Sequence, residues 1–351
     1  MKTRITVLGA GFAGMELSTI VSQALGDDVQ VTLIDASDAF VFGYSKLDLM
    51  FGHAMVDDVR LPYRRFVKPG VRLLRETVQA IDPEKRRVTT DAGTHDSDYL
   101  VVALGADYDF AATPGLDGAG EFYTVAGANR LREVLPGFSK GHALVGVCGA
   151  PYKCPPAPSE CALMLHDYLL TRGVRDQCSI TLVLPLPSPV PPSPETSKAL
   201  IAAFADRDIR FMPNHRIASV DTARRVASLD DGSELPYDLF LGVPRHRAPA
   251  VVEASGMAEG GWVPKAGVFA EGAAQAVASA LVSRIRGEGE GTLYSGAGTC
   301  YIEFGGGRIG RVDVDFFSGP KPTGTYHAPD VSLRADKEHF GASRKARWFG
   351  L

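Results

Sequence analysis

The chain has 351 residues, of which 45% are hydrophobic and 22% are charged, and its formal net charge is -4. This length accommodates two or three domains, and the composition is that of a globular protein. The slightly acidic balance excludes a strongly basic surface, so nucleic acid is not an expected partner.

The amino terminus shows no targeting signal, because the stretch MKTRITVLGAG runs directly into an apolar strand. No apolar run approaches the roughly 20 residues of a membrane span. The sequence therefore predicts a cytoplasmic protein, with at most peripheral contact with the inner face of a membrane. The five cysteines do not form the disulfide framework of a small secreted domain, so any pair is expected to be catalytic.

A first βαβ unit is predicted over residues 3–35, where a glycine turn, GAGFAG, separates a strand from a helix. Gly9 allows the tight turn, and Gly11 lets backbone N–H groups reach a pyrophosphate at the helix N-terminus. Gly14 permits close packing of the helix against the strand. Asp35 ends the second strand, where a carboxylate accepts hydrogen bonds from a ribose.

This combination of turn, helix and acid predicts binding of the adenylate half of a dinucleotide. The aspartate comes 21 positions after Gly14, which is the spacing that such sites require. Phe12 and Ala13 inside the turn and Ala36 after the aspartate are further cofactor-binding candidates. A chance glycine turn with an acid nearby is the alternative, and the agreement of four elements disfavours it.

A second βαβ unit is predicted further along the chain, together with two short buried strands. The four stretches are YLVVALGAD (99–107), HALVGVCGA (142–150) with a helix from about Ser159 to Arg172, SITLVLPLP (179–187) and LPYDLFLGVP (235–244). In the turn of this unit only Gly149 remains of a glycine fingerprint, and three prolines remove backbone donors for phosphate. The returning strand ends without an acid, so nicotinamide dinucleotide is not expected there.

The second turn holds a cysteine instead. Cys154 follows Lys153 near a helix N-terminus, and both features predict a lowered thiol pKa. Cys148, Cys161 and Cys178 fit buried, inert positions better.

The last third of the chain predicts a helix over 265–287, stopped by Gly287, and then an antiparallel hairpin that turns at 305–307. Proline clusters at 185–194 and 320–322 are interpreted as loops. The basic tail predicts a helix. Its aromatic residues Phe340, Trp348 and Phe349 are expected either to touch lipid headgroups or, as is commoner, to pack against the protein.

These stretches resemble the sulfide:quinone oxidoreductase and flavocytochrome c sulfide dehydrogenase flavoproteins of the FAD-dependent pyridine nucleotide-disulfide oxidoreductase superfamily. The likeness covers most of the chain and is carried by GAGFAG, YKCPPAPSE, KAGVFAEGAAQAVA and GTCYIEF. It implies an α/β fold of two Rossmann-like domains of the glutathione-reductase type. The FAD-binding domain would comprise 1–110 and 240–290, the second domain with its degenerate turn 111–239, and a C-terminal hairpin-and-helix region 291–351.

The resemblance also implies roles for individual residues. In that family two cysteines form a redox-active disulfide over the flavin, and here they would be Cys154 and Cys300. Glu160 matches an acid that manages protons, with a solvated or helix-capping glutamate as the alternative. Lys265 matches a group at the pyrimidine edge of the flavin, and Gly105 matches a strand-end glycine near the cofactor.

The implied reaction is attack of a sulfur nucleophile on this disulfide, with electrons passing through FAD to a quinone or similar acceptor. One alternative is a type II NADH dehydrogenase-like NAD(P)H:acceptor flavoprotein, and another is a non-catalytic flavin-binding redox sensor. The eight histidines are scattered without ligand spacing, so no metal site is expected. The oligomeric state is left open.

One stretch departs from the resembled family, in which a strand ending in Gly-Asp precedes the KAG helix and its aspartate binds FAD. Here the residues between Gly256 and Lys265 cannot supply both a strand of about five residues and the acid. Either this element was deleted, or a segment was closed up between Pro264 and Lys265. We expect the second, because every flanking motif survives.

Overall fold

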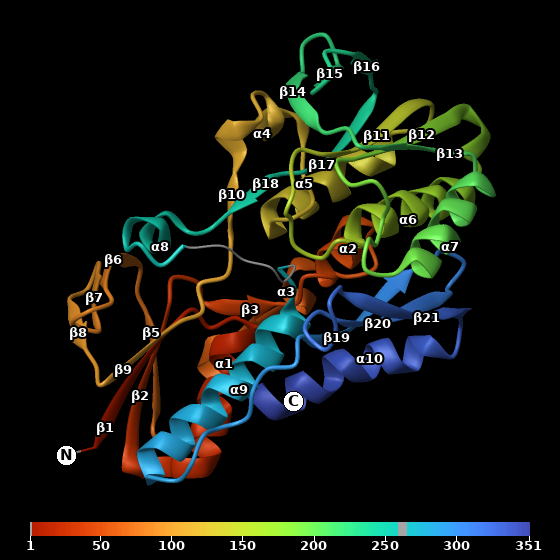
Figure 1. The fold of residues 1–351 in the computed structure, drawn as a ribbon. Coiled ribbons are helices and arrows are strands. Elements are labelled where there is room, and N and C mark those ends of the chain that lie inside the picture. Colours follow the sequence, from red (N-terminus) through yellow and green to blue (C-terminus); the bar gives the residue numbers. More distant parts are fainter. Residues whose placement is uncertain (1, 259–264) are drawn as a thin grey trace.

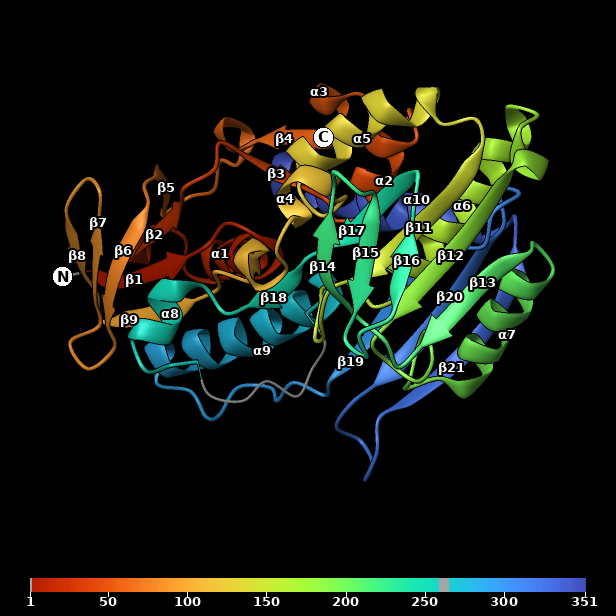
Figure 2. The ribbon, with the colours of Figure 1, turned by 90° about the horizontal axis from the view of Figure 1, so that it is seen from above.

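Two four-stranded parallel sheets form the frame of the protein in a computed structural model that describes residues 2–258 and 265–351 (Figure 1). The sheets lie toward opposite ends of the molecule (Figure 2). Their strand orders are β5-β2-β1-β9 and β13-β12-β11-β17, and every pairing in them is parallel. This repeated order confirms the predicted α/β fold with two Rossmann-like units.

The first sheet consists of β1 (Thr3–Leu8), β2 (Val29–Asp35), β5 (Val71–Arg75) and β9 (Tyr99–Val102). The second consists of β11 (Gly141–Val147), β12 (Cys178–Leu184), β13 (Ile209–Pro213) and β17 (Leu239–Val243). The central strands are buried on both faces, which is why they read as nearly continuous apolar runs.

Long helices cover these sheets. They are α1 (Phe12–Leu25), α6 (Ala157–Thr171), α7 (Pro194–Ala205) and α9 (Gly267–Arg286). Helix α9 lies along α1, as both views show. The approach is close enough that a Cβ atom at Gly267 would lie 2.5 Å from the Phe12 ring. Gly287 ends α9 in the left-handed conformation, as predicted.

A third, antiparallel sheet follows, made of β19 (Ala297–Glu303), β20 (Ile309–Asp315) and β21 (Thr323–Asp330). The predicted hairpin is confirmed, and all three glycines of its turn have positive φ. Strand β21 was not predicted. The sheet lies between α6 and the tail helix α10 (Leu333–Arg344), which continues as a π-helical turn, Lys345–Phe349 (Figure 1).

Shorter elements complete the described part of the chain. The strands are β3 (Ala39–Val41), β4 (Arg60–Pro62), β6 (Val78–Asp82), β7 (Arg87–Thr90), β8 (Thr94–Asp96), β10 (Asp107–Asp109), β14 (Ile217–Asp221), β15 (Val226–Leu229), β16 (Glu234–Pro236) and β18 (Arg245–Arg247). The helices are α2 (Ser45–Met50), α3 (Val56–Val59), α4 (Leu116–Ala119), α5 (Val125–Val134) and α8 (Ala250–Ala254), with single 3₁₀ turns at Gly26–Asp28, Tyr63–Arg65, Phe110–Ala112, Leu135–Gly137 and Arg175–Gln177.

Strand β17 corrects one expected boundary. It pairs with β11, so the second sheet continues to Val243, beyond the expected limit at residue 239. We propose the same three-part division of the chain with this boundary moved to Val243. The departure concerns the stretch between Gly256 and Lys265, of which residues 259–264 lie outside the described residues.

The C-terminal tail packs against the protein. Trp348 is fully buried, and its indole N–H donates to Glu16 Oε2 at 2.8 Å. Arg347 pairs with the same carboxylate at 2.8 Å. For Trp348 and Phe349 the alternative of lipid contact is therefore wrong, and the prediction that they pack against the protein is confirmed. Among the described helices, none has the length and apolar character needed to cross a bilayer.

Candidate functional site

The turn between β1 and α1 requires glycine at two positions and leaves space at a third. Gly9 has φ +96, and a Cβ there would lie 2.4 Å from the Ala103 carbonyl oxygen. A Cβ at Gly14 would lie 1.8 Å from the Gly9 carbonyl oxygen. At Gly11 a Cβ would meet nothing within 4 Å. A phosphate can therefore approach the backbone at Gly11.

The polar groups around this turn fit a dinucleotide. Asp35 Oδ2 accepts the Ala10 N–H at 2.7 Å, and Oδ1 accepts the Ser37 N–H at 2.8 Å. These bonds hold the carboxylate beside the turn, with lone pairs remaining for a ribose. Helix α1 has no side-chain cap at Gly11, so its first N–H groups are free to bind a pyrophosphate.

The flanking cofactor candidates differ in their surroundings. Ala13 is partly exposed in the first turn of α1, and Ala36 is exposed beyond β2. The Phe12 ring packs edge-on against Phe40 and Trp348, with ring centres 5.2 and 5.5 Å apart, so it stabilises the helix start rather than only facing a ligand.

Gly105 and Lys265 lie where the chain passes between the two units. Gly105 is exposed with φ +72, and a Cβ there would meet no atom within 4 Å. The carbonyl of Lys265 accepts the backbone N–H of Cys154 at 3.0 Å. The structure thus brings the start of α9 to the predicted reactive cysteine. Helix α9 also begins without a side-chain cap.

Cys154, Cys300 and Glu160 are brought together, although the two cysteines are 146 positions apart in the sequence. Both thiols are free, and both pack against the same hydrophobic cluster. The carboxylate of Glu160 contributes to raising the pKa of both. Glu160 Oε1 accepts the backbone N–H of Glu303 at 3.0 Å, which fixes α6 against β19.

The predicted lowering of the Cys154 pKa is wrong. Burial raises this pKa well above its ordinary value, and the charges of Glu160 and Cys300 raise it further. The side chain of the neighbouring Lys153 makes a separate contact. Its Nζ donates to the Ala106 carbonyl at 3.3 Å.

Burial also raises the pKa of Cys300 to about 12 and that of Glu160 to about 7. A carboxyl group with a pKa near neutrality can take up and release protons at physiological pH. Cys148, Cys161 and Cys178 are buried, as their predicted inert role requires.

Lys337 was not foreseen from the sequence, because nothing in the tail distinguishes it from other surface lysines. Its Nζ lies 2.5 Å from Glu303 Oε1 and 5.5 Å from the centre of the Tyr44 ring. Burial lowers the pKa of Lys337, but the carboxylates of Glu160 and Glu303 outweigh it and raise the pKa. The tail helix thus supplies a positive charge beside the carboxyl groups of the site.

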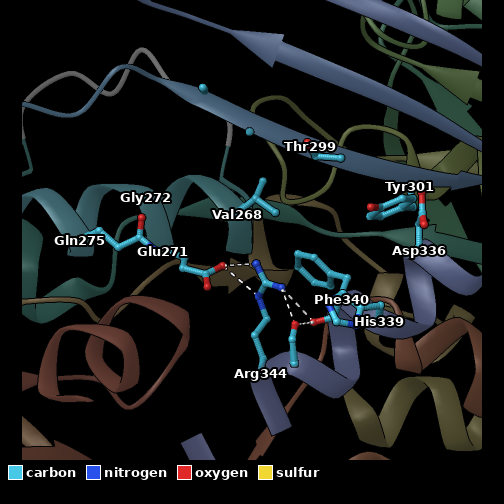
Figure 3. A pocket seen from close by; sticks show the side chains of 13 residues that line it. Val268, Glu271, Gly272, Gln275, Thr299, Tyr301, Asp336, His339, Phe340 and Arg344 are labelled. Carbon is cyan, nitrogen blue, oxygen red and sulfur yellow. Dashed lines mark hydrogen bonds and ion pairs between the residues drawn. The ribbon is translucent and has the colours of Figure 1, made fainter. Parts of the chain in front are cut away.

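A cavity of about 440 Å³ opens between α9, β19 and α10 (Figure 3). Arg344 reaches into it, with Nη2 2.6 Å from Glu271 Oε2 and the guanidinium 3.6 Å from the centre of the Phe340 ring. Thr299 and Tyr301 line it from β19. Side chains alternate along a strand, so the thiol between these two residues points to the opposite face of β19.

Comparison with known proteins identifies the family. The model for the family described as pyridine nucleotide-disulphide oxidoreductase matches residues 3–258. The chain belongs to this family. As a pyridine nucleotide-disulphide oxidoreductase, it is an FAD-dependent oxidoreductase, which confirms the predicted enzyme class and cofactor.

Two curated relatives of this pyridine nucleotide-disulphide oxidoreductase are named for quinone reduction. A sulfide-quinone reductase from Aquifex aeolicus is 24% identical over 265 residues, 73% of this chain and 61% of that protein. A type II NADH:quinone oxidoreductase from Staphylococcus saprophyticus is 32% identical over 133 residues, 37% of this chain and 33% of that protein. The chain thus spans less than two thirds of each relative's length.

The structural similarity covers more of the chain than the sequence alignments do. The solved structure of the sulfide:quinone oxidoreductase from Aquifex aeolicus matches with a TM-score of 0.85 at 20% identity. The match covers 98% of this chain and 91% of that chain. At this identity the likeness shows a common fold, including the third sheet and the tail helix.

Proposed function

We propose that this FAD-dependent enzyme oxidises sulfide, or a related sulfur nucleophile, through Cys154 and Cys300 and delivers the electrons to a quinone. The observation that carries the proposal is the grouping of two distant thiols around one buried carboxyl group, beside the start of α9. A redox sensor would need the thiol pair alone. The carboxyl group with a pKa near neutrality favours turnover, which requires repeated proton transfer.

The sulfur step is thiol–disulfide exchange. In the oxidised pair, a hydrosulfide ion attacks one sulfur, the S–S bond breaks, and a cysteine persulfide and a cysteine thiolate result. Charge is conserved, because the negative charge of the nucleophile passes to the released thiolate. The released thiolate sulfur then bonds to the outer sulfur of the persulfide, the S–H bond breaks, and one proton and two electrons leave the sulfur atoms. When bound, FAD would accept these two electrons and supply them to the quinone.

The chain's own residues manage the proton and the charge in this step. Burial makes a lone thiolate at Cys154 unfavourable, so the released sulfur needs a nearby proton donor or cation. The charge of Glu160 acts on both thiols, and with a pKa of about 7 this carboxyl group can hold that proton. Lys337 offsets the negative charge that the site gains during attack.

The cavity at Phe340 is the place that we propose for the quinone. Its volume of about 440 Å³ lies in the range of small-molecule sites, and it combines an aromatic ring with the guanidinium of Arg344. It lies on the face of β19 opposite the Cys300 thiol. The sulfur substrate and the quinone would thus occupy opposite faces of β19 and would not displace each other.

The deciding experiment is an anaerobic titration of the bound flavin, followed by its visible absorbance. Sulfide and NADH are added in turn to the wild type and to Cys154→Ser and Cys300→Ser variants. Cys178→Ser serves as the matched control, since this thiol is also buried but lies at the start of β12. We expect bleaching by sulfide in the wild type and the control, and none in the two site variants.

Bleaching by NADH that persists in both site variants would overturn the proposal. It would favour instead an NADH:quinone oxidoreductase, the activity for which the Staphylococcus saprophyticus relative is named. Reversible disulfide formation without any turnover would identify a redox sensor.

A further inference from the structure

A second group of polar side chains lies beside Cys154 and takes no part in the chemistry described above. Lys153 precedes it in the chain, and Lys46 comes from α2. Burial lowers the pKa of Lys46, against the opposing charges of Glu121 and Cys154. The charge of Lys46 also helps to lower the pKa of Lys153.

Aromatic residues hold Lys153 in place. Its Nζ lies 4.3 Å from the centre of the Tyr108 ring, and its carbonyl accepts the hydroxyl of Tyr123 at 2.8 Å. Burial, followed by the charge of Lys46, lowers its pKa to about 8, so it remains mostly charged at neutral pH. Within residues 2–258 and 265–351, no carboxylate lies within 4.0 Å of the ammonium group of Lys46 or Lys153.

His246 completes the group from β18, directly opposite Tyr108 on β10, with ring centres 4.9 Å apart. It is only 4% exposed. Nδ1 lies 2.8 Å from the carbonyl oxygen of Pro244, which can only accept, so Nδ1 carries the hydrogen. Burial and the charge of Lys153 lower the pKa of His246 to about 3, which keeps the ring neutral.

The other ring nitrogen is therefore a hydrogen-bond acceptor. Nε2 of His246 is buried and has no hydrogen-bond partner in the part of the chain that the structure describes. A buried acceptor without a donor is unfavourable, and so are two buried ammonium groups that no carboxylate contacts directly, although Glu121 raises the pKa of Lys46 and Asp107 raises that of Lys153. Both costs are removed by a small ligand that carries one negative charge and one hydrogen that it can donate.

We propose that Lys46, Lys153 and His246 receive the sulfur substrate as hydrosulfide, its singly protonated anion. The ammonium groups hold the negative charge, and Nε2 of His246 accepts the S–H hydrogen. This inference rests on the proposed function and names the residues that position the nucleophile beside Cys154. Halide ions lack the hydrogen, and neutral thiols lack the charge. The two kinds of contact together therefore favour hydrosulfide over halide ions and over neutral thiols.

The first test compares two reductants on the holoenzyme. The rate of flavin reduction is measured against the concentration of sulfide and of dithiothreitol, a neutral dithiol, in Lys153→Met and His246→Phe variants. We expect the half-saturating concentration of sulfide to rise at least tenfold while the limiting rate stays within threefold. With dithiothreitol both variants should stay within twofold of the wild type. Lys140→Met, at an exposed lysine, is the matched control.

Two conservative variants separate positioning from a structural role. Lys153→Arg keeps the charge, and His246→Gln keeps an acceptor oxygen, so both should retain most of the affinity for sulfide. Equal losses with sulfide and dithiothreitol, or no rescue by these variants, would overturn the inference.

A second test needs no turnover. The rates at which anionic iodoacetate and neutral iodoacetamide alkylate Cys154 are compared in the reduced protein by peptide mass analysis. Replacing Lys46 or Lys153 by Met should lower the ratio of the two rates at least threefold, and His246→Phe should leave it unchanged because that ring is neutral. An unchanged ratio in the lysine variants would overturn the inference. A wild type that sulfide fails to reduce would instead overturn the proposed function.

Discussion

Replacement of Glu160 by Gln tests whether burial of this carboxyl group lowers the free energy of unfolding as the pH rises. Burial raises its pKa from 4.5 to about 7, so the folded chain binds more protons here than the unfolded chain between these values. The group's contribution to stability is therefore present at low pH and lost as the pH rises through 7. At about 1.4 kcal/mol for each pH unit, the loss between pH 5 and pH 8 is about 2.5 kcal/mol.

Glutamine keeps the shape and an acceptor for the Glu303 N–H but cannot ionise. The difference in the free energy of unfolding between Glu160→Gln and the wild type should shift by about 2.5 kcal/mol in favour of the variant from pH 5 to pH 8. Urea denaturation at a series of pH values measures it. The same variant should reduce the rate of sulfide oxidation by roughly 10²-fold or more, as expected for loss of a general acid–base group.

A second carboxyl group, that of Glu76, should show the opposite pH dependence of stability. Burial would raise the pKa of Glu76, but hydrogen bonds from Thr90 and His95 outweigh it and lower the pKa. Its stabilising contribution is thus present above the unfolded pKa and lost as the pH falls. Glu76→Gln should therefore lose stability most at neutral pH. Stability curves for Glu160→Gln and the wild type that run parallel across this range would refute the reasoning.

Three further outcomes follow from packing and space. Gly9→Ala should lower the free energy of unfolding by at least ~1 kcal/mol, because Gly9 has a positive φ and a Cβ there would clash with the backbone. Gly11→Ala should leave the stability of the apoprotein unchanged, because a Cβ there meets no atom. The Gly11→Ala variant should nevertheless retain less FAD, as measured by its flavin content. Phe340→Ala should raise the KM for a short-chain quinone roughly twofold to tenfold relative to the KM for sulfide, and equal changes in both would contradict the cavity assignment. Trp348→Ala should lower the free energy of unfolding, measured with urea, by about 3–5 kcal/mol. The control Phe317→Ala, at a half-exposed side chain, should lower it by less than ~0.5 kcal/mol. Similar small losses in both variants would show that the tail does not anchor the fold.

Local sequence patterns predicted the elements that depend on a few neighbouring residues. The turn from Gly9 to Gly14, the stop at Gly287 and the hairpin before β20 all lie where the spacing of glycines and apolar residues placed them. Strand β21 was missed because polar residues and prolines surround it, and its pairing with β20 provides the stability that its own residues lack. Local patterns likewise could not assign β17 to its sheet, because that assignment depends on pairing with the distant strand β11.

The site was predictable only in part. Cys154 and Cys300 were expected together through a resemblance to a known family, and the contact of α6 with β19 brings them together. The direction of the thiol pKa was mistaken, because a neighbouring lysine and a helix start are local features, whereas burial depends on the whole fold. Lys46 and His246 carried no sequence signal.

The sequence alone thus determined the local features of this protein: the turn that leaves its N–H groups open for a phosphate, the glycine that ends α9, and the hairpin before β20. These features are local because backbone sterics act over a few residues. Only the tertiary structure decided which side chains ionise, which thiols meet and which ring nitrogen lacks a partner. Those properties depend on the exclusion of water and on charges contributed by segments far apart in the chain.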